Sequence, residues 1–254
     1  MRCSVRGKTV LVTGASAGIG LETARAFADE TAGDVRLVLA ARRIDRLEKT
    51  KTSLEELYPA IKVFVAQLDI QKPDLVRQFV LSLPQEFSEI DILVNNAGVA
   101  LGRDPVGTGD PGAVQTMLDT NVLGLITLTQ EIVPGMRRRN RGDIVNVGSI
   151  AGRTPYPGGA VYCATKAAVK YFTRSLRKEL LDTRIRVMEI VPGAVDTELR
   201  FVRHGGVRSE LEDKFMGENP LAAVEIADFI VYACTRRENT VIAEAVIVPT
   251  YQSH

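Results

Sequence analysis

Short apolar runs alternate with longer amphipathic segments along almost the whole chain. The runs are rich in β-branched residues and carry no regular polar alternation, which is typical of strands covered on both faces. They comprise residues 8–14, 35–41, 62–69, 91–98, 142–149, 185–193 and 244–249. Segments between them, such as 19–30 and 46–57, have helical spacing. The order predicts an α/β fold, a Rossmann-type doubly wound parallel sheet of about seven strands with helices on both faces.

Ligands of such a sheet bind outside the carboxyl ends of its strands. With 254 residues and 45% hydrophobic content, one large core is possible, so residues 1–254 are expected to form a single domain. The least regular stretches are residues 99–113 and 198–220. Because long irregular segments of compact domains are often binding loops, residues 198–220 are a candidate substrate lid.

Charge and composition narrow the possible partners. The 32 basic and 31 acidic residues give a formal net charge of +1, which offers no general attraction for nucleic acid or an anionic membrane. Three cysteines without a CxxC pair and two histidines do not suggest a metal site. No stretch reaches the roughly 20 apolar residues of a membrane span. We therefore expect a cytoplasmic protein that acts on a small molecule without a metal.

The first predicted strand leads directly into a glycine-rich turn, "TGASAGIG" at 13–20, which precedes a helical segment. Glycines let a backbone approach a pyrophosphate, and a helix N-terminus offers it free N–H groups. The context of strand, turn and helix favours dinucleotide binding over a simple tight turn, although the spacing is G-x-x-x-G-x-G. The residues expected to hold the dinucleotide here are Gly14, Ser16, Gly18, Ile19 and Gly20.

The end of the second predicted strand indicates which dinucleotide binds. A carboxylate there would accept bonds from the 2′-hydroxyl of NAD, whereas an arginine accommodates the 2′-phosphate of NADP. This strand ends "LAARR", with Ala40 and Ala41 followed by Arg42 and Arg43. The two arginines could also simply begin an exposed helix, but after the glycine turn they favour NADP(H).

A tyrosine and a lysine lie four residues apart in the helical stretch "VYCATKAAV" at 161–169. Tyr162 and Lys166 therefore share one helix face, where an ammonium can lower the pKa of a phenol. The spacing alone also fits a solvated lysine beside a half-buried tyrosine. Ser149 ends a predicted strand thirteen residues before Tyr162, at the ligand-binding edge of the sheet.

Together with "NNAG" at 95–98 and Asn121 in "DTNVLG", these motifs resemble the short-chain dehydrogenase/reductase family from about residue 7 onward. The resemblance implies that Tyr162 is the general acid in reduction and the base in oxidation. It implies that Lys166 stabilises the phenolate and holds the nicotinamide ribose. Ser149 would hydrogen-bond the substrate oxygen, and Asn121 would hold a water that relays protons.

Four further residues are expected beside the cofactor. Asp69 closes a strand where it could accept a bond from the adenine amino group, and Asn96 belongs to "NNAG". In the segment "VPGAVDT" at 191–197, the resemblance implies that Val195 contacts the carboxamide and Thr197 the phosphates or the amide. It also implies a homotetramer.

Further stretches, including "SIAGRTPYPGG" and "FVRHGG", resemble the NADP-dependent 3-hydroxy acid dehydrogenases of this family, which act on serine, L-allo-threonine and 3-hydroxyisobutyrate. Such an acid needs a cation for its carboxylate. Arg153 is the first candidate, and Arg200 and Arg203 in the suspected lid are the others. Two alternatives stay open: a broad-specificity NADPH-dependent carbonyl reductase, and a non-catalytic NADP(H)-sensing protein.

Overall fold

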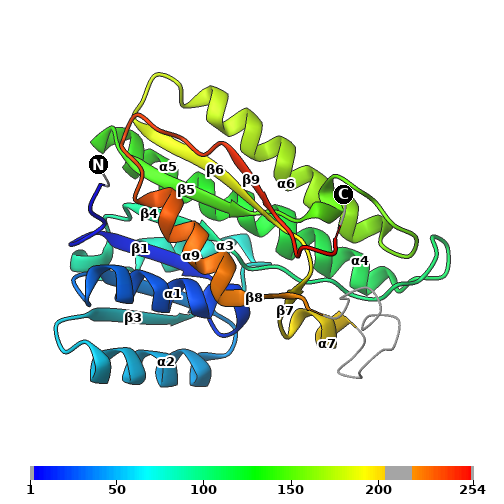
Figure 1. The fold of residues 1–254 in the computed structure, drawn as a ribbon, viewed down its shortest axis with the longest axis horizontal. Coiled ribbons are helices and arrows are strands. Elements are labelled where there is room, and N and C mark those ends of the chain that lie inside the picture. Colours follow the sequence, from blue (N-terminus) through cyan, green and yellow to red (C-terminus); the bar gives the residue numbers. More distant parts are fainter. Residues whose placement is uncertain (1–2, 204–218, 253–254) are drawn as a thin grey trace.

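Seven parallel strands form one sheet in a computed structural model, which describes residues 3–203 and 219–252 (Figure 1). Their spatial order is β3-β2-β1-β4-β5-β6-β9. The strands are β1 (Thr9–Thr13), β2 (Arg36–Ala41), β3 (Lys62–Gln67), β4 (Ile92–Asn95), β5 (Gly142–Val147), β6 (Ile185–Pro192) and β9 (Glu244–Ile247). Each lies within one of the predicted apolar runs, and the predicted doubly wound sheet is confirmed.

Alternation along the strands divides the core into two layers. Val10 and Val12 of β1 belong to one apolar cluster, and Leu11 between them belongs to the other. Helices α1 (Gly18–Thr31), α2 (Ile44–Leu57) and α9 (Ala223–Cys234) contribute to the first cluster. The second lies under α3 (Pro73–Leu81), α5 (Leu125–Arg139) and α6 (Ala160–Glu179). The unalternated strand composition follows from this burial on both faces.

The strand order reverses between β1 and β4. After β1 the chain adds β2 and β3 on one side, then returns to place β4 against the free side of β1, with Leu11 opposite Leu93. Because all seven strands are parallel, their carboxyl ends meet at one edge of the sheet. The turn after β1 lies at this switch point, where open α/β sheets leave a crevice.

Shorter elements surround this edge. They are η1 (Gln85–Phe87), α4 (Pro111–Leu118), the π-helical turn η2 (Asp119–Gly124), η3 (Ile150–Gly152), α7 (Leu199–Arg203) and the two-stranded pair β7 (Val195–Asp196) and β8 (Leu221–Ala222). Most of the suspected lid at 198–220 lies outside the described residues, which include only its first six and last two positions. Within the described part of the chain, no helix has the length and hydropathy to cross a membrane.

Candidate active site

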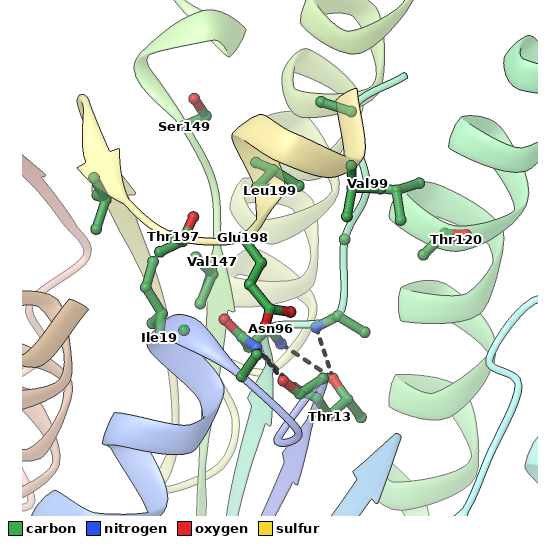
Figure 2. A pocket seen from close by; sticks show the side chains of 18 of the residues that line it. Thr13, Ile19, Asn96, Val99, Thr120, Val147, Ser149, Thr197, Glu198 and Leu199 are labelled. Carbon is green, nitrogen blue, oxygen red and sulfur yellow. Dashed lines mark hydrogen bonds between the residues drawn. The ribbon is translucent and has the colours of Figure 1, made fainter. Parts of the chain in front are cut away.

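A cavity of about 360 Å³ opens at the carboxyl ends of the strands. Its walls come from the segments that follow β1 to β6, together with α6 and the β7–α7 segment (Figure 2). Residues from both halves of the doubly wound sheet therefore face one another across the switch point. The volume is in the range of small-molecule and cofactor sites.

The glycine turn leaves the floor of this cavity bare. Gly14 has φ +65°, and a Cβ there would lie 2.8 Å from Asn96 Nδ2 and 2.9 Å from Ala97 Cα. Gly18 has φ +55° and packs against Thr197. Helix α1 then begins without a side-chain cap, so its first N–H groups point at the cavity without an internal partner. A bare backbone at an uncapped helix start suits the pyrophosphate of a dinucleotide.

Thr13 and Asn96 clamp the turn to the end of β4. The Thr13 hydroxyl accepts hydrogen bonds from the backbone N–H groups of Asn96 at 3.1 Å and Ala97 at 3.0 Å. Asn96 Nδ2 in turn donates to the Thr13 carbonyl at 2.9 Å, and Figure 2 shows this pair at the base of the cavity. The Asn96 side chain therefore holds the glycine turn in place against the end of β4.

Arginines lie at the end of the cavity beside β2. Arg43 donates from Nε and Nη2 to the Ser16 hydroxyl at 3.2 and 3.0 Å. Its Nη1 lies 2.8 Å from a carboxylate oxygen of Glu198, and Arg46 Nη1 lies 2.6 Å from the other. Arg42 also lines the cavity. This end of the cavity is thus the place where a second anion would find guanidinium groups.

Ser149, Tyr162 and Lys166 converge on the opposite end. Ser149 follows β5 and lies close enough to the Tyr162 phenol to lower its pKa, while the Lys166 ammonium lies 5.9 Å from the centroid of the Tyr162 ring. Lys166 Nζ also donates to the Val147 carbonyl at 2.9 Å. All three residues line the cavity. A proton donor, a cation and a hydroxyl thus meet at one point.

Burial shifts both titrating groups toward their neutral forms. It raises the pKa of Tyr162 to about 12, although the hydrogen bond from Ser149 and the charge of Arg203 oppose this shift. It lowers the pKa of Lys166 to about 8, although the carboxylate of Glu189 opposes that shift. In both cases the interior solvates the charged form poorly. Opposite shifts of neighbouring groups in one cavity are typical of active sites.

Asn121 lies in the π-helical turn behind the cavity. Its Oδ1 accepts the N–H of Val99 at 2.8 Å, and its Nδ2 donates to the Val99 carbonyl at 2.8 Å and to Thr165 at 3.0 Å. The side chain therefore ties the segment after β4 to α6, just before Lys166. Turns of π-helix inside longer helices are often found at functional sites.

This arrangement agrees with comparisons against known proteins. Residues 8–204 match the family model described as short chain dehydrogenase. The chain belongs to the short-chain dehydrogenase family. It is 46% identical over 246 residues to an NADP-dependent 3-hydroxy acid dehydrogenase of Schizosaccharomyces pombe, which covers 97% of this chain and 94% of the relative.

Two further relatives extend the comparison. A sulfoacetaldehyde reductase of Chromohalobacter salexigens is 39% identical over 96% of this chain and 94% of its own. The solved closed form of a serine dehydrogenase complexed with NADP⁺ superposes with a TM-score of 0.90 at 37% identity, covering 97% of this chain and 96% of that one. This short-chain dehydrogenase therefore shares its whole fold with proteins whose names specify NADP.

Most of the predicted site residues line the cavity. They are Gly14, Ser16, Gly18, Ile19, Arg42, Arg43, Asp69, Asn96, Ser149, Tyr162, Lys166, Val195, Thr197, Arg200 and Arg203. Gly20 and Asn121 lie behind the lining. A Cβ at Gly20 would lie 2.6 Å from the Gly14 carbonyl, so that glycine permits close packing of α1 against the turn.

Arg153 is not brought to the cavity of this short-chain dehydrogenase. Its Nη2 lies 3.1 Å from Glu189 and 2.8 Å from Glu244, and it is not among the residues that line the cavity. Glu189 is 1% exposed and needs a paired cation. Two protein carboxylates therefore pair with the guanidinium, which favours an anchoring role for Arg153 over binding of a substrate carboxylate.

Arg203 lies at the end of the cavity that holds Ser149, Tyr162 and Lys166. It is 6% exposed, its guanidinium carbon lies 5.8 Å from the centroid of the Tyr162 ring, and its Nη1 donates to the Tyr156 hydroxyl at 2.9 Å. Its Nε donates to the Gly102 carbonyl at 3.0 Å. A second tyrosine and an arginine thus form the wall of the cavity next to the Ser149–Tyr162 pair.

Sequence reasoning missed Thr13, Tyr156 and Glu198 as lining residues. Thr13 is the last residue of β1, so its position directly before the glycine turn could have indicated that it lies beside the cavity. Tyr156 lies in "TPYP", a loop whose path the sequence pattern does not predict. In the described part of the chain, no group of three or more His, Cys, Asp or Glu side chains has the arrangement of a metal site.

Proposed function

We propose that this protein is an NADP-dependent oxidoreductase that moves a hydride between NADP and the 3-hydroxyl carbon of small 3-hydroxy acids. The observation that carries the proposal is the position of Arg203 beside Tyr162. A proton-transferring phenol next to a buried guanidinium suits a substrate in which the reacting hydroxyl lies close to an anionic group.

The residues at the adenosine end fit NADP. The turn at Gly14 and Gly18 would hold the pyrophosphate, and Arg42 and Arg43 would hold the 2′-phosphate. Neither Ala40 nor Ala41 offers the carboxylate that would hold the 2′-hydroxyl of NAD. Bound NADP supplies the nicotinamide carbon that gives or accepts the hydride. Asp69 would bind the adenine, while Val195 and Thr197 would bind the nicotinamide half.

Tyr162 moves the proton. In reduction its phenol protonates the carbonyl oxygen, and in oxidation its phenolate takes the proton of the alcohol. A phenol with a pKa of about 12 is ionised in only about one molecule in 10⁵ at pH 7, so oxidation depends on nearby positive charge. Lys166 supplies part of that charge on the same helix face, and Ser149 holds the substrate oxygen. Asn121 holds a water that connects Lys166 with solvent.

Arg203 and Tyr156 recognise the anionic group of the substrate. The guanidinium is buried and held by Gly102 and Tyr156, so little side-chain freedom is lost when a carboxylate binds. The names of the relatives support this assignment, because a 3-hydroxy acid, serine and sulfoacetaldehyde are all small molecules with a carboxylate or a sulfonate.

One alternative is a carbonyl reductase that works mainly toward the alcohol. The sulfoacetaldehyde reductases among the relatives favour this direction, and the protonated state of Tyr162 is the one that reduction uses. A non-catalytic NADP(H) sensor is the weaker alternative, since it has no need of Ser149, Tyr162 and Lys166 at one end of the cavity.

We also infer a cytoplasmic homotetramer. Exposed apolar side chains on the segment from α4 to α6 support assembly, among them Leu118, Leu123 and Tyr171, which are 41%, 42% and 65% exposed. Large apolar side chains that remain exposed over adjacent elements often mark contacts between subunits.

The experiment follows NADPH formation with serine, L-allo-threonine, 3-hydroxyisobutyrate and simple alcohols, and NADPH consumption with the matching carbonyl compounds. The acids are expected to exceed the neutral alcohols in kcat/KM. In Tyr162→Phe the rate should fall by about 10²–10⁴-fold while NADP still binds. Equal turnover of acids and neutral alcohols would refute the substrate class, and full activity of the phenylalanine variant would refute the mechanism.

A further inference from the structure

Glu198 lies where the 2′-phosphate of the cofactor is expected. Its two carboxylate oxygens are divided between Arg43 at 2.8 Å and Arg46 at 2.6 Å. The same Arg43 binds Ser16 in the glycine turn. Figure 2 shows the Glu198 side chain extending from between Thr197 and Leu199 into the cavity that these residues line.

The carboxylate resembles a phosphate in what it offers the arginines. Both anions accept bonds from two guanidinium groups at once, and the arginines hold the pKa of Glu198 below its usual range, Arg43 most strongly. Asp196 lies two residues before Glu198, but it pairs with Arg200 at 3.2 Å and does not contribute to this contact. Among the described carboxylates, Glu198 is therefore the one that pairs with Arg43 and Arg46.

We propose that Glu198 is an internal occupant of the 2′-phosphate subsite and sets how strongly the protein prefers NADP to NAD. This inference rests on the proposed NADP dependence. Glu198 must leave Arg43 and Arg46 before they can bind a phosphate, and it then lies beside them as a repelling charge. Arg46, which the sequence did not single out, becomes a phosphate ligand together with Arg43.

The expected effect is moderate because both partners are partly exposed. The side chains of Arg43 and Glu198 are 43% and 44% exposed, and such ion pairs are weak. Because two such pairs act on one carboxylate, removing it should tighten binding of a 2′-phosphate by about 3–10-fold. NAD does not need the arginines to be released, and its affinity should change by less than about two-fold.

The occupied subsite also tethers the β7–α7 segment. Glu198 lies between Thr197, which packs on Gly18, and α7, which carries Arg203. Release of Glu198 by a phosphate therefore loosens the start of the segment that lines the substrate end. Filling the adenosine end is thus coupled to the residues that meet the substrate.

The test compares Glu198→Gln and Glu198→Ala with wild type by titration calorimetry, using 2′,5′-ADP, 5′-AMP, NADP⁺ and NAD⁺ as probes. Glu86→Gln is the matched control, since Glu86 pairs at 2.6 Å with Lys62, which begins β3 at the amino end of the strand and does not line the cavity. Both Glu198 variants should bind 2′,5′-ADP and NADP⁺ about 3–10-fold more tightly at low salt, with a smaller gain at high salt. The control and 5′-AMP should show no gain.

Hydrogen exchange gives an independent reading of the same contact. Residues 195–203 should exchange faster in free Glu198→Gln than in free wild type, and 2′,5′-ADP should speed exchange there in wild type but not in the variant. Unchanged or weaker binding of 2′,5′-ADP by both Glu198 variants, or an equal gain for 5′-AMP, would overturn the inference. Failure of wild type to bind 2′,5′-ADP would instead refute the NADP dependence.

Discussion

The variant Arg153→Ala tests whether Arg153 anchors the Glu189 carboxylate or binds the carboxylate of a substrate. In the structure this side chain is 16% exposed and pairs with Glu189, which is 1% exposed, and with Glu244, which is 28% exposed. The variant leaves the Glu189 carboxylate buried without its main partner. Loss of one partner of a buried pair destabilises a protein by about 3–5 kcal/mol.

The lower end of that range applies, because Arg153 is not fully buried and Lys170 also acts on Glu189. A loss of about 3 kcal/mol should lower Tm by about 6–12 °C in a chain of this size. The double variant Arg153→Leu with Glu189→Leu removes both charges and should recover most of this loss, since apolar replacements of buried pairs are often neutral or stabilising.

The stability of Arg153→Ala should also depend on pH in a defined direction. Burial raises the pKa of Glu189 above its ordinary value even with Arg153 present, and the variant raises it further. Between the ordinary and the raised value, the native state holds a proton that the unfolded state has lost. Unfolding free energy of the variant therefore increases as pH falls across this window, relative to wild type.

Urea unfolding of the three proteins at pH 5.5 and pH 8 measures these effects, and initial rates with 3-hydroxyisobutyrate give KM. We expect a large loss of stability and a KM within about two-fold of wild type. A variant with an unchanged urea midpoint and a strongly raised KM would refute the anchoring role and restore the substrate role.

Three further predictions concern the site itself. Arg203→Gln should raise KM for 3-hydroxyisobutyrate by about 10–100-fold, from the loss of a charged hydrogen bond of about 1.5–3 kcal/mol, and should leave KM for a neutral alcohol nearly unchanged; initial rates with both substrates check this. Gly14→Ala should lower the urea midpoint and weaken NADP binding, because φ is +65° and the new methyl group would meet Asn96 and Ala97. Lys166→Met should be more stable than wild type at pH 7, because the variant has no buried ammonium, whose cost shows in the lysine pKa of about 8. Wild type then gains stability relative to this variant as pH rises from about 8 toward the ordinary lysine value, as urea midpoints at pH 7 and pH 10 would show.

The fold could be predicted because burial on both faces leaves a local signature. Each strand is an unalternated apolar run, and the residues that follow the strands must gather at one edge of a parallel sheet. The glycine turn was also readable, since the left-handed backbone at Gly14 and Gly18 excludes most other residues. These features depend on neighbours in sequence and on one topological rule.

The fate of Arg153 could not be predicted in the same way. It follows Ser149 by four residues, but after the 3₁₀ turn of Ile150–Gly152 its side chain pairs with Glu189 on β6. Glu189 is an acidic residue within an apolar strand, and only the register of β6 against β5 brings it there. Tyr156 and Glu198 were missed for the same reason, since their partners are distant in sequence.

The two shifted pKa values show how the site favours one proton position. In water a lysine and a tyrosine have similar pKa values, but here they are about 8 and about 12, and the proton stays on Tyr162. The folded site is therefore set for proton donation, as carbonyl reduction requires. In the proposed mechanism, oxidation needs positive charge beyond Lys166, which the oxidised nicotinamide of NADP⁺ would provide, so the redox state of the bound cofactor would select whether Tyr162 acts as acid or base.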